Sequence, residues 1–305
     1  MSTEFGSSLP TSDPRRVSLP RTSTVVKHIV ALAFMIGGLV ATIWTFLHTG
    51  TGQWIDETAL TEVSNGLVAY SEPSGELLNA IPVISGIFAL IGLLFVLIRR
   101  HRFLPAIVGL LAAGAANAMT QILKNVLLDK PDLGIQEATV NSLPSGHTTF
   151  AASAGAALFI AAPKRWRPAM ALLMMMFTVT TGVATVIKGW HRPADVLAAI
   201  FVVGVWTVLG LFALRFIPAE DRDTADTRYM GMLVIPLCVI MGLFMGFCSA
   251  ATYVVAQTEH LTGAALLGSL CLISAISLIC TAALVALLRV RPRPQDRVYT
   301  KVWTY

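Results

Sequence analysis

Charge is scarce in this sequence. Only 13% of its 305 residues are Asp, Glu, Lys or Arg, whereas 55% are hydrophobic and the mean hydropathy is +0.71. Soluble domains carry about 25% charged residues, so this composition excludes an ordinary soluble domain and indicates a polytopic membrane protein. The net charge of +5 does not indicate a nucleic-acid partner, because the distribution of the cations has another explanation.

Cysteines are few, and none lies in a polar connection. The four are Cys238, Cys248, Cys271 and Cys280, all inside apolar runs and without metal-type spacing. This excludes a disulfide framework and a cysteine metal centre, and it favours small buried side chains. We find no His, Asp or Glu ligand set for a metal, and we expect no cofactor.

Eight apolar runs are close to the roughly 20 residues that a membrane-spanning helix needs. We therefore predict an all-α fold, a polytopic membrane bundle of eight transmembrane helices. The fourth run is short and rich in Ala and Gly, so we expect it to pack centrally. The runs are 28–48, 77–98, 103–125, 147–163, 168–188, 193–215, 230–256 and 261–288.

The chain divides by composition into two tails, a core, a connector and an appended pair of helices. The first segment is rich in Ser, Thr, Pro and Arg, which is typical of a disordered tail. We predict a cytoplasmic tail at 1–26, a six-helix core at 27–216, a cytoplasmic connector at 217–228, two additional transmembrane helices at 229–289 and a cytoplasmic tail at 290–305.

Lys and Arg gather on one side of the predicted bundle. With an even number of spans, 18 of the 22 fall in the two tails and in the connections after the second, fourth and sixth spans. The positive-inside rule makes that side cytoplasmic. We therefore predict a multi-pass protein of the plasma membrane with both termini in the cytoplasm.

The opposite face nearly lacks positive charge. Its loop 49–76 holds five acidic residues and no Lys or Arg, and a stripe at Ile55, Leu60, Val63 and Leu67 predicts a short helix on the membrane surface. The four remaining cations all sit next to span ends: Lys124, Lys130, Lys188 and Arg192.

The stretch Lys188–Asp195, KGWHRPAD, concentrates these charges at a junction between two spans. Pro193 suits the first turn of a helix, and His191 and Asp195, four residues apart, then share a face. A carboxylate beside an imidazole fixes its tautomer and stabilises a charged ring. The alternative is a juxtamembrane cluster that only anchors helix ends.

A second motif, Pro144-Ser145-Gly146-His147, begins the fourth run. Ser145 predicts a helix N-cap, and the free amides of a helix start form an anion site with His147 at its rim. The alternative is an ordinary cap beside an interfacial histidine.

A third motif, Lys124 with Lys130-Pro131-Asp132, ends the third run. Since a lysine at the bilayer centre costs roughly 2.5–3.5 kcal/mol on insertion scales, Lys124 should reach the interface or a polar site.

Together the three motifs resemble the type-2 phosphatidic acid phosphatase (PAP2) superfamily, whose pattern is a lysine with a downstream Arg-Pro, then PSGH, then Ser-Arg before a His-x-x-x-Asp. The sequence departs from that pattern where Lys130 replaces the first Arg and where Ala184 and Thr185 replace Ser-Arg. A lysine holds phosphate as a point charge rather than a bidentate fork, so Lys188 and Arg192 are candidate substitutes.

The resemblance implies a phosphohistidine mechanism. His191 would be the nucleophile, Asp195 would orient it and His147 would protonate the leaving oxygen. The phosphate-binding residues implied are Lys124, Lys130, Ser145 and Gly146, with Lys188 and Arg192 as further candidates.

Two functions remain open. One is a metal-independent phosphatase at the outer face, whose substrate would be a membrane lipid phosphate such as a polyprenyl pyrophosphate, a phosphatidate or a phosphatidylglycerophosphate. The other is a PAP2-like accessory or scaffold subunit, which the missing arginines and the last two spans favour, since those spans could contact partner membrane proteins. Under the first hypothesis, truncation near Asp221 should leave activity largely intact.

Overall fold

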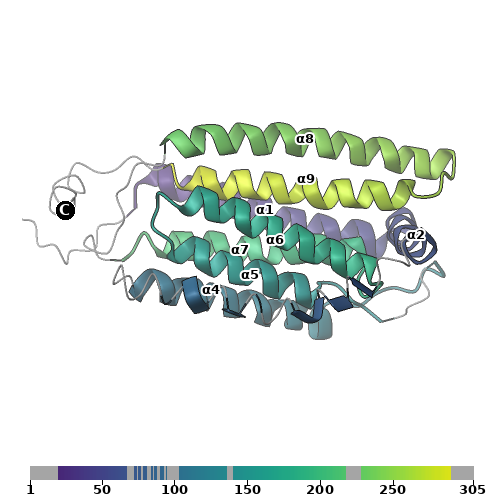
Figure 1. Cartoon of the computed structure of the whole chain (residues 1–305), viewed down its shortest axis with the longest axis horizontal. Coiled ribbons are helices and arrows are strands. Elements are labelled where there is room, and N and C mark those ends of the chain that lie inside the picture. Colours follow the sequence, from purple (N-terminus) through teal and green to yellow (C-terminus); the bar gives the residue numbers. More distant parts are fainter. Residues whose placement is uncertain are drawn as a thin grey trace, which may run out of the picture.

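The chain forms a bundle of helices in a computed structural model that describes residues 20–66, 103–135, 140–217 and 228–289, with isolated positions between 72 and 94. The predicted all-α class is confirmed (Figure 1). The elements are α1 Thr22–His48, α2 Gly50–Gly66, α4 Phe103–Ile122, the π-helical turn η1 Leu123–Leu127, α5 Gly146–Ala161, α6 Arg167–Ile187, α7 Pro193–Ala213, α8 Arg228–Thr258 and α9 Ala264–Leu287.

Six helices in the described part of the chain are long and apolar enough to cross a membrane: α1, α4 with η1, α6, α7, α8 and α9. They fit a multi-pass membrane protein. The 16 residues of α5 make it shorter than these spans, and the predicted span 77–98 lies outside the described residues except at scattered positions. The count of eight therefore stays a prediction.

The first helix begins earlier than its apolar run. Thr22 lies within the predicted tail 1–26, yet the amides of Thr24 and Val25 both donate to the Arg21 carbonyl and start the helix there. Backbone hydrogen bonds, unlike hydropathy, do not stop at the edge of an apolar run. The rest of that tail, most of the connector 217–228 and the C-terminal tail lie outside the described residues.

One helix lies across the end of the bundle. The short surface helix predicted within loop 49–76 is α2, which Figure 1 shows almost end-on beside the parallel helices. It buries Ile55, Ala59 and Val63, while Leu60 is only half-buried. The apolar side of α2 therefore packs on the bundle, and its polar residues reach the turns between the long helices.

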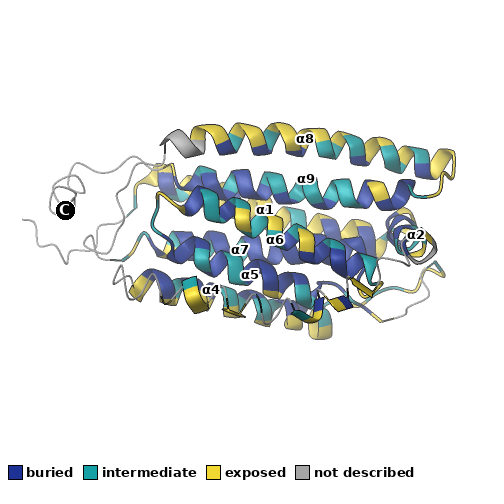
Figure 2. Ribbon diagram, in the orientation of Figure 1, coloured by how far each residue is buried: buried dark blue, intermediate teal, exposed yellow. Residues whose placement is uncertain are grey.

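The centre of the bundle is α7. It contacts α1, α4, α5 and α9, and its residues from Pro193 to Gly204 are all buried (Figure 2). Its sequence is apolar all round, as a helix surrounded by protein requires. The Ala- and Gly-rich α5 is also largely buried between α4, α6 and α7, so the expected central position of the fourth run is confirmed.

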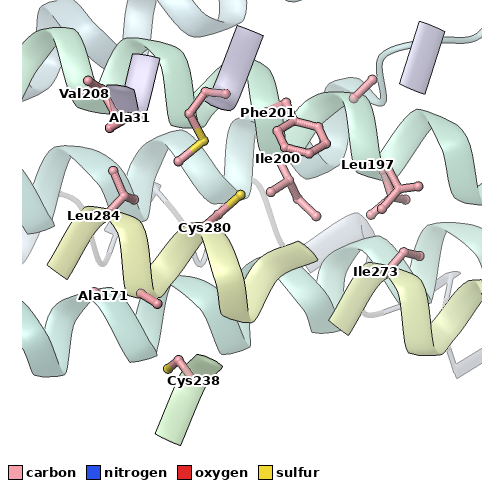
Figure 3. Packing of buried hydrophobic residues seen from close by; sticks show 14 of the residues in the cluster. Ala31, Ala171, Leu197, Ile200, Phe201, Val208, Cys238, Ile273, Cys280 and Leu284 are labelled. Carbon is pink, nitrogen blue, oxygen red and sulfur yellow. The ribbon is translucent and has the colours of Figure 1, made fainter. Parts of the chain in front are cut away.

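The last helix shares the core of the others. Figure 3 shows Ile273, Cys280 and Leu284 of α9 in one cluster with Phe201 of α7 and Ala31 of α1. In contrast, α8 lies on the outside and exposes large apolar side chains along its length (Figure 2). The pair α8 and α9 is thus no separate unit, because α9 fills the main core and α8 covers α9.

The four cysteines are free thiols, with Cys238 and Cys280 buried. They pack as small apolar side chains, as predicted.

Cations at the end of the bundle opposite α2 terminate helices. The buried Arg167 donates to the carbonyls of Ile160 and Ala162 at the end of α5. Arg215 donates to the Leu287 carbonyl at the end of α9. These side chains satisfy carbonyls that have no intrahelical partner and complement the negative end of the helix dipole.

Candidate functional site

The turn between α6 and α7 presents His191. Gly189 adopts a left-handed conformation with φ of 75°. Its amide donates to the Val186 carbonyl, and the Trp190 amide donates to the Thr185 carbonyl. This pair of bonds is a Schellman motif, which favours glycine at the left-handed position. It ends α6 sharply, and Pro193 then begins α7.

A carboxylate holds the imidazole of His191. Asp195 Oδ2 lies 2.9 Å from His191 Nδ1 and 3.1 Å from the Arg192 amide that donates to it. Both His191 and Asp195 are buried. The arrangement assigns the Nδ1 proton to the side facing Asp195 and leaves Nε2 as the nitrogen with a free lone pair, as a nucleophile requires.

The start of α5 is tied directly to this turn. The Ser145 amide donates to the Asp195 carbonyl at 2.9 Å, and Ser145 Oγ accepts from the Thr148 amide at 3.3 Å. Ser145 is therefore the N-cap that its motif predicts. Its hydroxyl is fully buried, so in this structure it caps the helix, and its contact with a phosphate stays a prediction.

Two backbone amides in the first turn of α5 have no hydrogen-bond acceptor in the described part of the chain. Among the described residues, neither the Gly146 nor the His147 amide has a hydrogen-bond partner. First-turn amides have no acceptor within their own helix, and together with the helix dipole they favour an anion. The backbone of the PSGH motif can thus hold an anion through these two amides.

The structure brings the two predicted histidines together. The ring centroids of His147 and His191 are 6.5 Å apart in an edge-to-face arrangement. The His147 ring also lies 5.3 Å from the ring of Trp190, a partly exposed residue. The two rings are close enough that one group could contact both, as a nucleophile and a proton donor acting on the same substrate require.

The first motif approaches from the end of α4. Lys124 lies in η1, close enough to His147 for the charges of the two side chains to interact. Asn141 donates to the Lys124 and Leu128 carbonyls and so joins this turn to the segment before PSGH. No carboxylate of the described residues pairs with Lys124, so its charge is available to an anion.

Lys130 lies in the connection that follows η1, near the start of α7. Partial burial lowers the pKa of its ammonium, and the positive Arg192 nearby lowers it further, against the opposing effect of Glu57. Lys130, which takes the place of the family's arginine, therefore interacts electrostatically with charged residues around the His191 turn.

Two of the predicted phosphate ligands are held by carboxylates. Arg192 donates from Nε and Nη2 to the same oxygen, Oε2 of Glu57, at 2.8 and 2.6 Å. Lys188 pairs with the exposed Glu72 at 3.3 Å. The Glu57 pair is largely buried, so Arg192 is primarily part of a link between α2 and α7. Phosphate binding by Lys188 and Arg192 stays a prediction.

The acidic residues of α2 were not predicted to join the site. Asp56 Oδ1 accepts from the Ala194 amide at 2.9 Å, beside the Glu57–Arg192 pair. Burial raises the pKa of Asp56 well above its ordinary value, and the nearby Asp195 carboxylate adds to this effect. The available signal was the excess of acidic residues in loop 49–76, which indicated charge on that face but no partner for it.

Polar contacts join α4 and α5 below the histidines. Thr120 and Thr149 lie 3.0 Å apart, and Asn117 donates to Ser153 Oγ at 2.8 Å. Interhelical hydrogen bonds of this kind stabilise helix pairs within a membrane. They fix the two helices whose ends carry Lys124 and His147.

Fold and site together define a helical membrane protein with a two-histidine centre at one end of its bundle. Residues 110–219 match the model of the PAP2 superfamily. The resemblance that the three motifs predicted is thus confirmed for the segment that runs from α4 to the end of α7. No curated protein and no solved structure matches the chain. Within the described ranges, no group of three or more His, Cys, Asp or Glu side chains could hold a metal ion.

Proposed function

We propose that the protein is a lipid phosphatase that acts without a metal and passes through a phosphohistidine. Membership of residues 110–219 in the PAP2 superfamily supports phosphatase-type chemistry in general. The observation that carries the specific proposal is the pair of histidine rings at 6.5 Å, of which one has its Nδ1 held by a buried carboxylate.

In the first step, His191 Nε2 attacks phosphorus and forms a P–N bond. The bond from phosphorus to the lipid oxygen breaks, and that oxygen takes a proton from His147. Asp195 stabilises the positive charge on the His191 ring. Lys124 and the amides of Gly146 and His147 stabilise the negative charge on the phosphoryl oxygens.

In the second step, water attacks the phosphohistidine. His147, now neutral, accepts a proton from that water, and the P–N bond breaks to release phosphate and restore His191. The same residue thus serves as acid and then as base. A phosphorylated lipid suits the site because the phosphate of an amphiphile lies at the membrane interface, where we place the outer end of the bundle.

The test is phosphate release from lipid phosphates by the purified full-length protein in the presence of a chelator. The panel contains a phosphatidate, a phosphatidylglycerophosphate and a polyprenyl pyrophosphate. His191→Ala should abolish release, and Asp195→Asn should lower it by up to about 10⁴-fold, as for the loss of charge in a comparable His–Asp pair. His48→Ala, an exposed histidine at the end of α1, is the control and should retain wild-type activity.

A second candidate is an accessory or scaffold subunit with little activity. It is favoured by the Glu57–Arg192 ion pair and by Ala184 and Thr185 in the place of the family's Ser-Arg, since these leave no uncommitted guanidinium in the described part of the site. Release of phosphate no faster than by His191→Ala, across the whole panel, would exclude the phosphatase and favour this alternative. Co-purification of partner membrane proteins would then be the next measurement.

A further inference from the structure

Three carboxylates of α2 contact residues at the starts of two other helices. Asp56 accepts from the Ala194 amide in the first turn of α7. Glu57 accepts from the Arg192 guanidinium just before it. Glu62 Oε2 accepts from the Leu266 amide in the first turn of α9 at 2.7 Å. One short surface helix thus joins two helix starts that are far apart in the sequence.

These contacts have a clear energetic basis. First-turn amides lack intrahelical acceptors, so a buried one needs a partner from elsewhere. A carboxylate supplies that acceptor and also meets the positive end of the helix dipole. Asp56 is only 3% exposed, and burying an acid costs free energy unless hydrogen bonds offset it. The Ala194 amide provides such a bond, and the raised pKa of Asp56, caused by burial and by Asp195, shows that the cost is not fully offset.

The contacts converge on the turn that carries the nucleophile. Arg192 follows His191 directly, and Ala194 precedes Asp195. Within the turn, Asp195 orients the ring of His191 and accepts from the Arg192 amide. From outside the turn, Asp56 and Glu57 hold its backbone and its arginine. The ring is therefore oriented by one carboxylate, while the backbone that places the ring is fixed by two others.

We propose that α2 is a positioning element of the site. Asp56 and Glu57 position the His191 turn. Glu62 holds α2 in place through its contact with the start of α9. Arg192 on this view acts through Glu57 and not as a phosphate ligand. The inference deepens the proposed function and rests on it for its activity readout, while its structural readout is independent of activity.

The first test compares two Asp56 variants in the full-length protein with a phosphatidate substrate. Asp56→Asn keeps an oxygen that accepts from the Ala194 amide, and we expect its kcat within about threefold of wild type. Asp56→Leu removes the acceptor. Since a displacement of about 1 Å can cost about 100-fold in rate, we expect its kcat to fall by about 10- to 100-fold with an unchanged KM. Glu259→Gln, an exposed carboxylate at the end of α8, is the matched control and should behave as wild type.

Glu57 provides a second test, in which a conservative variant keeps part of the contact with Arg192. Glu57→Ala releases Arg192, and Glu57→Gln keeps one acceptor oxygen for it. We expect about a tenfold loss of kcat and a lower melting temperature for Glu57→Ala, because it leaves the buried Arg192 without its partner. Glu57→Gln should recover part of both. A lower KM in Glu57→Ala with unchanged kcat would instead make the released Arg192 a phosphate ligand, and would overturn its assignment as a positioning residue.

Hydrogen–deuterium exchange of the segment 189–197 supplies the readout that needs no turnover. We expect faster exchange at the start of α7 in Asp56→Leu and Glu57→Ala, and wild-type exchange in Asp56→Asn and Glu259→Gln. If Glu57→Ala matches Glu259→Gln in both kcat and exchange, the positioning role is wrong. If the wild-type protein shows no turnover but the exchange pattern holds, the phosphatase proposal fails and the positioning of the turn by α2 stands.

Discussion

Asp56 is an acid in a place where a negative charge is costly. It is buried beneath the start of α7, near Asp195, and it accepts a hydrogen bond from the Ala194 amide. Its pKa in the folded protein is raised well above the ordinary value of 3.8, chiefly by burial. The folded protein therefore binds more protons than the unfolded chain at pH values between those two pKa values, and stability must depend on pH there.

The sign of that dependence gives a prediction. Because the folded-state pKa is raised, the contribution of Asp56 to stability is fully present below pH 3.8 and is lost as the pH rises through the folded-state pKa. We expect the melting temperature of wild type to fall more than that of Asp56→Asn when the pH is raised from about 4 to 8. Thermal unfolding in detergent at both pH values measures this, with Glu259→Gln as the control. An equal fall in wild type and Asp56→Asn would contradict it.

At the scale of the elements, α4 and α5 approach each other closely at a glycine. A Cβ added at Gly109 of α4 would lie 2.7 Å from the Ala157 carbonyl oxygen of α5. Backbone cannot move aside as a flexible side chain can, so this contact requires glycine. The close approach also brings Asn117 and Thr120 within hydrogen-bond distance of Ser153 and Thr149, and small residues at such an interface are typical of membrane helix pairs.

Gly109→Ala should therefore destabilise the protein, whereas Gly114→Ala should not. Both replace a glycine of α4, but a Cβ at Gly114 would meet nothing within 4 Å. We expect Gly109→Ala to cost about 1–3 kcal/mol through overpacking, and Gly114→Ala to remain within about 1 kcal/mol of wild type or to gain from helix propensity. Denaturation in mixed micelles measures both. Equal stabilities would mean that α4 and α5 do not approach as closely as the structure has them.

At the scale of the whole molecule, the two ends of the bundle differ in charge and in what the charges do. The end with α2 holds His147, His191 and the carboxylates around them, while Arg167, Arg215 and Lys27 cap or contact helix C-termini at the other end. Capping explains why some cations lie at that end, and the positive-inside rule predicts that the same end is cytoplasmic. Helix capping and the positive-inside rule therefore both favour cations at this end of the bundle.

We predict that the site end faces the outside of the cell. In a variant without native cysteines, a cysteine at Thr51 or Leu261, both exposed at the site end, should react with an impermeant thiol reagent added to intact cells. A cysteine at the exposed Arg165 or Trp166 should react only after the membrane is permeabilised. The opposite pattern would invert the orientation and place the proposed site in the cytoplasm.

Removal of α8 and α9 should destabilise the protein. The sequence favoured an appended pair whose loss near Asp221 leaves activity intact, but Ile273 and Leu284 of α9 lie in the main core, and Glu62 of α2 contacts Leu266. A chain that ends near residue 221 would expose the buried faces of α6 and α7. We expect a lower melting temperature than for the full chain and a loss of phosphate release. A stable and active truncated protein would restore the original expectation.

The sequence alone determined the class of the protein, most of its helices and the motifs of its site. Apolar runs placed seven of the predicted spans within a few residues of helices that the structure describes, because burial from water is a local property of each segment. Motif order and spacing also selected the PAP2 superfamily, since the histidine with its carboxylate and the capped helix start are each encoded within a few neighbouring residues.

Only the tertiary structure decided what those residues contact. The pairing of Arg192 with Glu57 spans 135 positions, and the contact of Glu62 with the Leu266 amide spans 204. No periodicity or spacing encodes such partners, because they depend on where the helices pack. Hydropathy likewise assigned α9 to the membrane but not to the core, since lipid and protein interior are equally apolar. The packing of the helices decides which apolar face contacts lipid and which cation pairs with a carboxylate, because both depend on residues that are distant in the sequence.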